Sequence, residues 1–307
     1  MWLLLRLAVA GETDASFALG VDLNETPHGL VNVEVRRGAW TGSLITDTLQ
    51  ARWDPAGERG RAWVAGRGEF GAAGLMISPW TDGAPDPDRA MAVSYGGLEG
   101  GAVRYLSRGL YAGGQGSARY YVFSEVGQGR RSLPADHPVV GGDGLVGWWT
   151  PEAQAWARLG VDYSLGTWAP HAHVELKSRA DKALAPRFEL RAGWAQHQDE
   201  VLRTRVGGLN PYVVPLAGAA WGELWVEDYA ALRGGGGWHG GRVEADLLVD
   251  VVSSDVQASA AGFALDTRWK HERLYLDADA GYAPFLLRQE GVGAWSVWLV
   301  FGREWGA

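Results

Sequence analysis

The sequence predicts an all-β protein, namely an antiparallel transmembrane β-barrel of about 14 to 16 strands. Apolar and polar residues alternate with a period of two from one end of the chain to the other. The alternating segments are long, and tryptophan and tyrosine recur at their ends. Because successive side chains of a strand point to opposite faces, this period indicates a sheet with one apolar and one polar face.

The segment 154–166 shows the alternation clearly, and the other strands are expected on the same pattern. Leu159 and Val161 fall on its apolar face, whereas Arg158 and Asp162 fall on the opposite face. In chain order, we expect strands at 16–24, 29–37, 40–53, 60–70, 89–96, 102–111, 117–126, 144–149, 154–166, 168–178, 186–196, 216–229, 241–252, 261–272, 273–282 and 294–305.

Residues that favour turns separate these segments. Short turns are expected at 24–29, 54–60, 96–101 and 112–116, where residues such as asparagine, proline and glycine favour them. The run Gly234–Gly237 precedes a strand and lacks the Gly-Lys-Ser/Thr of a phosphate-binding loop, so we interpret it as a turn as well. Longer polar or proline-rich connections are expected at 71–88, 127–143 and 197–215.

Length and composition bound the domain organisation. The 307 residues suit one large barrel, and we expect 13–307 to form a single β-barrel domain. Residues 1–12 are interpreted as the remnant of an export signal or as an N-terminal stub, because an apolar run ends in the small-x-small pattern of Ala8, Val9 and Ala10. The chain has no cysteine, which excludes disulfides and thiolate metal sites. No apolar run approaches the ~18 residues of a transmembrane helix.

The apolar face of the sheet is expected to contact lipid rather than a packed core, so the lipid bilayer is the first partner. Several strands run ten residues or more, whereas strands of soluble sandwiches cluster near five or six and a tilted bilayer crossing needs about 9–11. Amphipathic rings at headgroup depth form the aromatic girdles of membrane barrels. The aromatic residues that end apolar faces are Trp40, Trp53, Trp168, Trp194, Trp269, Tyr282, Trp295 and Trp305.

The last strand carries the most specific signal. In GAWSVWLVFGREW, residues 293–305, every second residue from Trp295 is apolar or aromatic. This stretch resembles the C-terminal signal strand of bacterial outer-membrane β-barrels, although Gly306 and Ala307 follow the final aromatic residue. The resemblance implies a location in the bacterial outer membrane. The residues that it places against lipid are Trp295, Val297, Leu299 and Phe301.

A narrower resemblance covers RVGGLNPYVVPLAGAAWGELWVEDY, residues 205–229. It is similar to the Gly-Gly, loop and long-strand region late in Omp85-type barrels. The arginine–glycine–aromatic loop motif of that family is missing, and residues 209–212 stand near its place.

The polar face carries charges of both signs, which we expect to line the barrel lumen. A charged residue on the lipid face costs ~2–4 kcal/mol at the bilayer midplane, so these side chains must point inward. The candidate lumen-lining residues are Arg158, Asp162, His171, His173, Glu175, Lys177, Arg187, Glu189, Arg191, Glu223, Glu227, Arg242, Glu244, Asp246, Asp266, Arg268 and Asp277.

Two functional readings of this lumen remain open. In the first, the barrel is a passive pore or a translocation barrel whose charges filter small solutes or a translocated polypeptide. In the second, the interior is plugged or closed by salt bridges, and the barrel has a structural, assembly or partner-binding role. The inward positions of the last strand include Trp298 and Val300, which are more apolar than other inward positions. A partly plugged interior therefore remains one of the alternatives.

Other chemistry is not expected. His171, His173 and Glu175 share one face at i, i+2 and i+4, yet we interpret them as lumen-facing polar residues rather than a metal site. No G-x-S-x-G pattern occurs, so we expect neither catalysis nor a cofactor. A net charge of −8 argues against nucleic acid as a partner. A barrel enzyme and a soluble all-β binding protein are the further alternatives, and the oligomeric state is unknown.

Overall fold

The computed structural model describes residues 13–23, 28–45, 48–57, 60–69, 80–86, 88, 90–126, 135–178, 184–209, 213–220, 222–289 and 292–305. The expected export-signal remnant, residues 1–12, lies outside the described residues, as do Asn210, Pro211 and Tyr212. No helix in the described ranges is long and apolar enough to cross a membrane.

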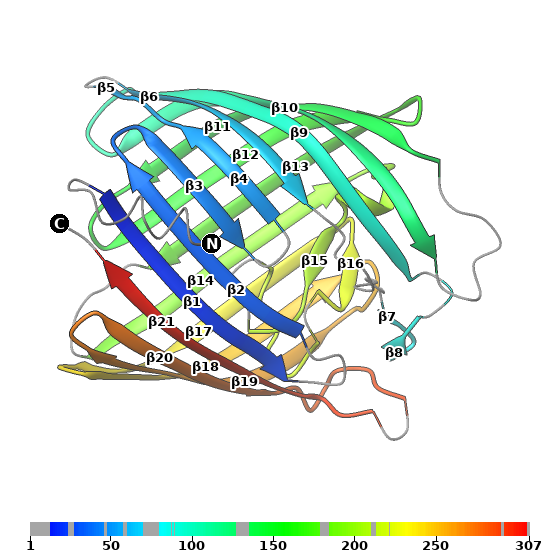
Figure 1. Cartoon of the computed structure of the whole chain (residues 1–307). Helices are drawn as coiled ribbons and strands as arrows, with labels where there is room; N and C mark the ends of the chain where they lie inside the picture. Colours follow the sequence, from blue (N-terminus) through cyan, green and yellow to red (C-terminus); the bar gives the residue numbers. More distant parts are fainter. Residues whose placement is uncertain are drawn as a thin grey trace.

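Sixteen antiparallel strands form one closed barrel, which confirms the predicted fold class (Figure 1). Each strand pairs with its neighbour in the chain, and β1 pairs with β21 from Ala15–Trp305 to Leu23–Val297 to close the sheet. The strands of the barrel are β1 Thr13–Leu23, β2 His28–Arg37, β3 Trp40–Ile45, β4 Thr48–Trp53, β6 Gly60–Glu69, β9 Met91–Tyr105, β10 Leu110–Val126, β11 His137–Trp149, β12 Ala153–Ser164, β13 Thr167–Ser178, β14 Leu184–Ala195, β17 Tyr229–Gly240, β18 Val243–Ser254, β19 Ala260–His271, β20 Leu274–Tyr282 and β21 Trp295–Trp305.

Short elements occupy the connections. A two-residue strand, β5, extends the sheet beside β6, and β7 and β8 form a small hairpin between β6 and β9. The connection from β14 to β17 holds one 3₁₀ turn, η1, and a separate two-stranded sheet. These short elements are β5 Ala56–Gly57, β7 Trp80–Thr81, β8 Ala84–Pro85, η1 Glu200–Leu202, β15 Thr204–Val206 and β16 Leu224–Val226.

The two ends of the barrel differ. Thr13 of β1 and Trp305 of β21 lie at one end, which we call the terminal end and which also carries short turns such as 38–39 and 241–242 (Figure 1). The opposite end, the loop end, carries the connections 70–90, 127–136, 196–228 and 283–294. The alternation of short and long connections is the arrangement typical of membrane barrels.

Two of the predicted turns were wrong, because their glycines lie inside strands. Residues 96–101 belong to β9 and 112–116 to β10, so the predicted strands at 89–96, 102–111 and 117–126 form only two strands. A Cβ on Gly101 would lie 2.8 Å from the Gly114 carbonyl oxygen. Glycine therefore permits a close approach of neighbouring strands here instead of forming a turn.

The prediction around Gly234–Gly237 was wrong for the same reason. These residues lie in the middle of β17, and a Cβ on Gly235 or Gly237 would overlap the backbone of β18. The strand expected at 216–229 is reduced to the three residues of β16, and the barrel strand follows it. The strand expected at 40–53 is a hairpin, β3 and β4. The expected upper count of sixteen strands is therefore correct only because these errors compensate.

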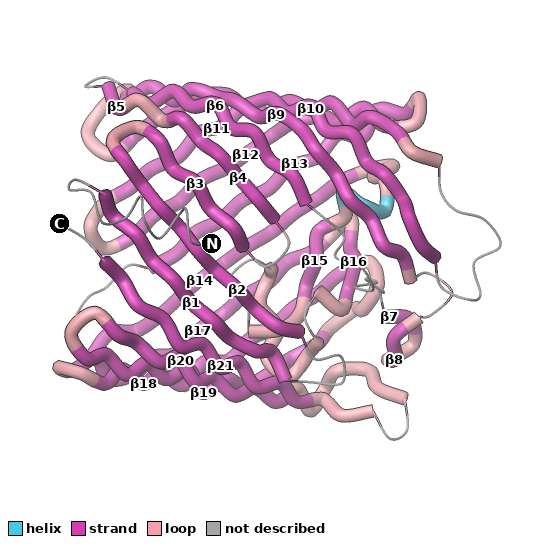
Figure 2. The backbone as a smooth tube through the Cα atoms, viewed as in Figure 1, coloured by secondary structure: helices cyan, strands magenta, loops and turns pink. Residues whose placement is uncertain are grey.

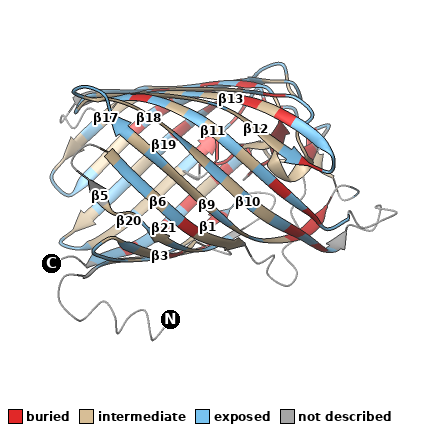
Figure 3. Cartoon of the chain, turned by 90° about the horizontal axis from the view of Figure 1, so that it is seen from above, coloured by how far each residue is buried: buried red, intermediate tan, exposed pale blue. Residues whose placement is uncertain are grey.

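Exposed residues of the outer surface alternate along the strands with residues that point into the barrel (Figure 3). In β21, Trp295, Leu299 and Phe301 are exposed, whereas Trp298 and Val300 are buried. Val297 lies on the same outward face and is half-buried, and the side chain of Trp305 lies outside the described residues.

Exposed aromatic side chains form two bands on the outer surface. Trp168, Trp194, Tyr282 and Trp295 lie near the loop end of their strands, and Trp40, Trp53 and Trp269 lie near the terminal end. Each is at least 41% exposed. Rings at both edges of an apolar belt are typical of a barrel that spans a bilayer.

Candidate functional site

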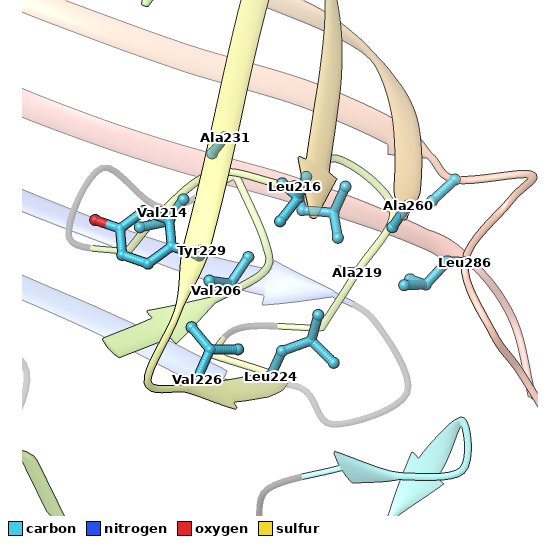
Figure 4. Packing of buried hydrophobic residues seen from close by; sticks show 12 residues of the cluster. Val206, Val214, Leu216, Ala219, Leu224, Val226, Tyr229, Ala231, Ala260 and Leu286 are labelled. Carbon is cyan, nitrogen blue, oxygen red and sulfur yellow. The ribbon is translucent and has the colours of Figure 1, made fainter. Parts of the chain in front are cut away.

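The lumen is not empty, because the connection from β14 to β17 folds into it. Residues 196–228, which we call the inserted segment, include η1 and the β15–β16 pair, which lie within the barrel (Figures 1 and 2). Val206, Leu216 and Val226 of this segment are fully buried. They pack with Tyr229 and Ala231 of β17, Val252 and Ala260 of the neighbouring strands and Leu286 of the β20–β21 connection (Figure 4).

One side of the inserted segment docks against an apolar part of the barrel wall. Leu209 and Ala217 pack with a set of inward side chains, which are Ala18, Leu30, Leu248, Ala264, Trp298 and Val300. The unusual apolar positions Trp298 and Val300 of the last strand therefore have a structural reason. They contact the inserted segment rather than water.

Hydrogen bonds from backbone amides of the inserted segment to side chains of the wall hold the same side of the segment in place. The Ala217 amide donates to Asp250 Oδ2 at 2.8 Å, and the Gly218 amide donates to Ser296 Oγ at 3.1 Å. Arg233 donates to both carboxylate oxygens of Asp250, at 2.6 and 2.8 Å. Asp250 is fully buried, so its charge is balanced by this guanidinium and by the amide of the inserted segment.

Two glycines of the wall provide the space for this docking. A Cβ on Gly262 of β19 would overlap the Ala217 carbonyl group, and a Cβ on Gly281 of β20 would lie 2.7 Å from the Gly218 amide nitrogen. Gly218 itself has a φ of 82°, a conformation that favours glycine. We call Gly262 and Gly281 the docking glycines.

The opposite side of the inserted segment packs against β9, β10 and β11. Trp225 is buried and Val201 and Leu202 are partly buried there. Their partners are Met91, Val93, Tyr95, Tyr121, Phe123 and Val139. The inserted segment thus spans the lumen between two walls.

A carboxylate fastens the start of the inserted segment. Asp199 Oδ2 lies 2.8 Å from His137 Nε2 and accepts a hydrogen bond from Ser164 Oγ at 2.8 Å, and Asp199 Oδ1 caps η1 through the Val201 amide. His137 Nδ1 lies 2.8 Å from the Ala135 carbonyl oxygen. Each ring nitrogen of His137 thus lies beside an oxygen atom, one of Asp199 and the other of Ala135.

Replacement of Asp199 by alanine is expected to loosen the start of the inserted segment by about 2–4 kcal/mol, because buried His137 and Ser164 lose their acceptor. Amide hydrogen exchange of residues 199–206 should accelerate while exchange in β12 stays unchanged. The matched variant Ser164→Ala removes one hydrogen bond and should cost about 1 kcal/mol. Equal, unchanged exchange in both variants would contradict this role of Asp199.

The end of the inserted segment is held by a buried ion pair that joins three connections. Both Glu223 carboxylate oxygens accept hydrogen bonds from the Arg288 guanidinium, of which Nη2–Oε2 is 2.7 Å. The guanidinium lies 4.6 Å from the centre of the Trp80 ring, and the Trp80 amide donates to the Glu223 carbonyl oxygen at 2.9 Å. The connections 70–90, 196–228 and 283–294 therefore meet at Glu223.

Burial determines the electrostatics of this pair. The Glu223 side chain is 1% exposed and the Arg288 side chain 8% exposed. Burial raises the pKa of the Glu223 carboxyl, whereas the Arg288 guanidinium and the Ala220 amide, which donates to Oε2 at 2.8 Å, act in the opposite direction. Each partner is therefore needed to keep the other charge in a water-poor site.

A first group of candidate lumen residues lies on β12 and β13. Arg158, Asp162, His171 and His173 line a cavity of about 180 Å³ together with Asp143 and Gln115. His171 Nε2 lies 2.6 Å from Asp143 Oδ1, and Nδ1 lies 3.2 Å from Asp162 Oδ2. Within the described ranges, no group of three or more metal-ligating side chains is arranged to hold a metal ion.

A second, larger group surrounds two cavities of about 450 and 460 Å³ on the β13–β20 side. Ion pairs cross between the strands, such as Arg187–Asp246 at 2.9 Å and Lys270–Glu244 at 2.6 Å. The candidate residues that line the cavity of about 450 Å³ are Lys177, Arg187, Glu189, Arg191, Glu244, Asp246, Asp266, Arg268 and Asp277.

The remaining candidates lie elsewhere. Glu175 is 3.4 Å from Arg191 on the neighbouring strand. Glu223 and Glu227 belong to the inserted segment rather than to a barrel strand, and Glu227 pairs with Arg203. Arg242 is exposed in the turn between β17 and β18.

Sequence reasoning missed several residues of the site. Asp143 fell in a predicted connection and Arg233 in the strand interpreted as a glycine turn, so neither was read as an inward position. In the sequence, Leu232 before Arg233 continues a period of two that could have revealed β17. Nothing in the sequence signals that Arg288 of a loop meets Glu223, because their contact joins two irregular connections.

Comparisons with known proteins place the fold. No family model and no curated protein matches the chain. Among solved structures, CdiB from Acinetobacter baumannii has a TM-score of 0.62 at 13% identity, over 96% of this chain and 60% of that chain. BamA from Haemophilus ducreyi, lacking POTRA domains 1–3, has a TM-score of 0.66 at 8% identity, over 96% and 70%. CdiB from Escherichia coli has a TM-score of 0.62 at 10% identity, over 95% and 63%.

These similarities establish the fold and no more. The chain spans 60% and 63% of the two CdiB chains that it matches. Its fold is that of a closed antiparallel β-barrel similar to those of CdiB and BamA, which supports the resemblance to outer-membrane β-barrels of the Omp85 type.

Proposed function

We propose that this chain, with the fold of an Omp85-type outer-membrane barrel, lies in a bacterial outer membrane and forms a passive pore that the inserted segment narrows. The observation that carries this proposal is the pair of cavities of about 450 and 460 Å³ beside the inserted segment. Charged side chains of both signs surround them, and a polar wall keeps such spaces hydrated. Ions and small hydrophilic solutes are the proposed cargo.

The inserted segment sets the size of this pore. It contacts β9–β11 on one side and the wall around β18, β19 and β21 on the other. We therefore expect low conductance from the native barrel and higher conductance when the segment leaves the wall. The likeness of the fold to CdiB and BamA supports a finer form of the proposal, in which a polypeptide passes through the widened barrel.

A permanently plugged barrel with a structural or assembly role is the second candidate. It is favoured by the three apolar clusters that hold the inserted segment and by the buried Glu223–Arg288 pair. Catalysis has less support. Ser164 Oγ donates to Asp199 rather than to His137, so these three residues lack the serine-to-histidine hydrogen bond of a nucleophile and its base.

Single-channel recording in planar lipid bilayers tests the proposal. The purified, folded barrel should give discrete current steps in 1 M potassium chloride, and heat-unfolded protein from the same preparation should give none. Current from the folded barrel supports the pore. No current at any applied voltage, from the native chain or from variants that release the inserted segment, would remove the pore and leave the plugged barrel.

A further inference from the structure

The outer rim of the terminal end carries a set of arginines that the lumen does not use. Two of them, Arg37 and Arg104, continue outward positions of β2 and β9, and the others lie in the turns between strands. All are exposed. We call this set, Arg37, Arg104, Arg108, Arg242 and Arg273, the arginine rim.

These arginines lack an acidic partner in the described part of the chain. The ion pairs of the described residues include none of the five. In the described turns of the terminal end, the exposed carboxylates are those of Glu152 and Glu272. An exposed guanidinium without a carboxylate is free to bind an external anion, and its planar donors suit phosphate.

The arginine rim lies next to the aromatic band of the terminal end. Arg37 is paired with Trp40 across β2 and β3, and Trp40 is 60% exposed. Arg242 precedes Val243, which pairs with exposed Trp269. Aromatic side chains of a membrane barrel lie at headgroup depth, so guanidinium groups just beyond them lie at the level of the lipid phosphates.

The described connections of the loop end carry exposed charge of the opposite sign. The exposed carboxylates in these connections are those of Asp82, Asp88, Asp136, Asp228 and Asp255. The described arginines of the same connections, Arg203, Arg205 and Arg288, are only partly exposed. Among the described connections, exposed positive charge therefore lies at one membrane surface and exposed negative charge at the other. A general need for solubility would not require this separation.

From these observations we propose that the arginine rim binds anionic phospholipid headgroups in the leaflet at the terminal end. The positive guanidinium groups of the rim complement the negative charge of the headgroups. The adjacent aromatic band places these groups at the depth of the headgroups. This interaction does not depend on conduction through the lumen, so it stands whether the barrel is a pore or is plugged.

Tryptophan fluorescence in vesicles tests the proposal. The barrel is reconstituted in phosphatidylcholine vesicles in which 20 mol % of the lipid is either brominated phosphatidylglycerol or brominated phosphatidylcholine. Bromine quenches nearby tryptophans, and Trp40 and Trp269 lie beside the rim. We expect brominated phosphatidylglycerol to associate about fivefold more strongly, which is the gain expected when one headgroup contacts one arginine of the rim.

Three variants and a salt series make the result specific. Replacing all five arginines by glutamine should abolish the preference, whereas replacing all five by lysine, which keeps the charge, should retain most of it. Asp82→Asn together with Asp88→Asn changes charge at the other end and should leave the preference intact. Raising sodium chloride to 0.5 M should weaken the native preference through screening. The heat-dependent gel mobility of each variant reports folding.

The opposite results would overturn the proposal. Equal quenching by the two brominated lipids in the native barrel would show that the rim has no headgroup preference, and would leave an acidic protein partner as the reading of the rim. A preference that persists in the glutamine variant would assign headgroup binding to other residues. If the glutamine variant fails to fold, the salt series decides instead. A native preference that salt does not weaken would overturn headgroup binding by the rim.

Discussion

Replacement of Arg288 by methionine is expected to release the end of the inserted segment and to raise the single-channel conductance of the barrel. Methionine has a similar length but leaves Glu223 as an unpaired charge in a site where its side chain is 1% exposed. Breaking a buried ion pair in this way costs about 3–5 kcal/mol. This cost in free energy destabilises the contact among the three connections rather than the barrel sheet, so the strands should stay folded.

Hydrogen exchange and conductance measure this effect together. Amides of 222–226 should exchange about 10²–10⁴-fold faster in Arg288→Met, whereas amides of β12 should not change. The double variant Glu223→Gln with Arg288→Met removes the charge as well as its partner, and most of the protection should return. If the single and double variants were equally unprotected, the charge of Glu223 would not be the cause.

Replacement of Gly262 by valine should displace the middle of the inserted segment from the barrel wall. The new side chain would overlap Ala217, whose amide donates to Asp250, so that hydrogen bond must break or the wall must bend. Overpacking of this kind costs about 1–3 kcal/mol, and loss of the Asp250 contact adds to it. We expect larger and more variable current steps than in the native barrel. Gly281→Val should act in the same direction.

Gly234→Val is the matched control, because it makes the same change in a neighbouring part of the sheet. No atom lies within 4 Å of a Cβ at Gly234, which is outside the docking glycines and away from the inserted segment. Its conductance should equal that of the native chain. If Gly262→Val and Gly234→Val gave identical native-like currents, docking at the wall would not limit the pore.

The strand periodicity was predictable because lipid and water impose opposite requirements on the two faces of every strand. The outward residues Leu299 and Phe301 and the buried Trp298 illustrate how a period of two is read without any knowledge of the fold. Glycine was the weak point. Gly97 and Gly101 of β9 allow close strand contacts, and sequence alone does not distinguish this role from that of a turn.

The candidate site was predictable in part. Charges on clearly alternating strands, such as Arg187 and Asp246, are found beside the same cavity. The apolar inward residues Trp298 and Val300 indicated a partly filled lumen as one alternative, and the inserted segment contacts both. The occupant itself was not predictable, because its contacts join irregular segments far apart in the chain. Glu223 and Arg288 are separated by 65 positions, and no local pattern links them.

The docking surface of the inserted segment has a consequence for assembly order. Ala18 and Leu30 come from the first two strands and Trp298 and Val300 from the last one, so this surface exists only after the two chain ends have joined. Arg288 likewise reaches Glu223 only once the final hairpin is in place. Closure of the cylinder and occupation of its interior are therefore coupled events. A nascent barrel with an open seam would hold residues 213–220 loosely, and completion of the wall would fix them.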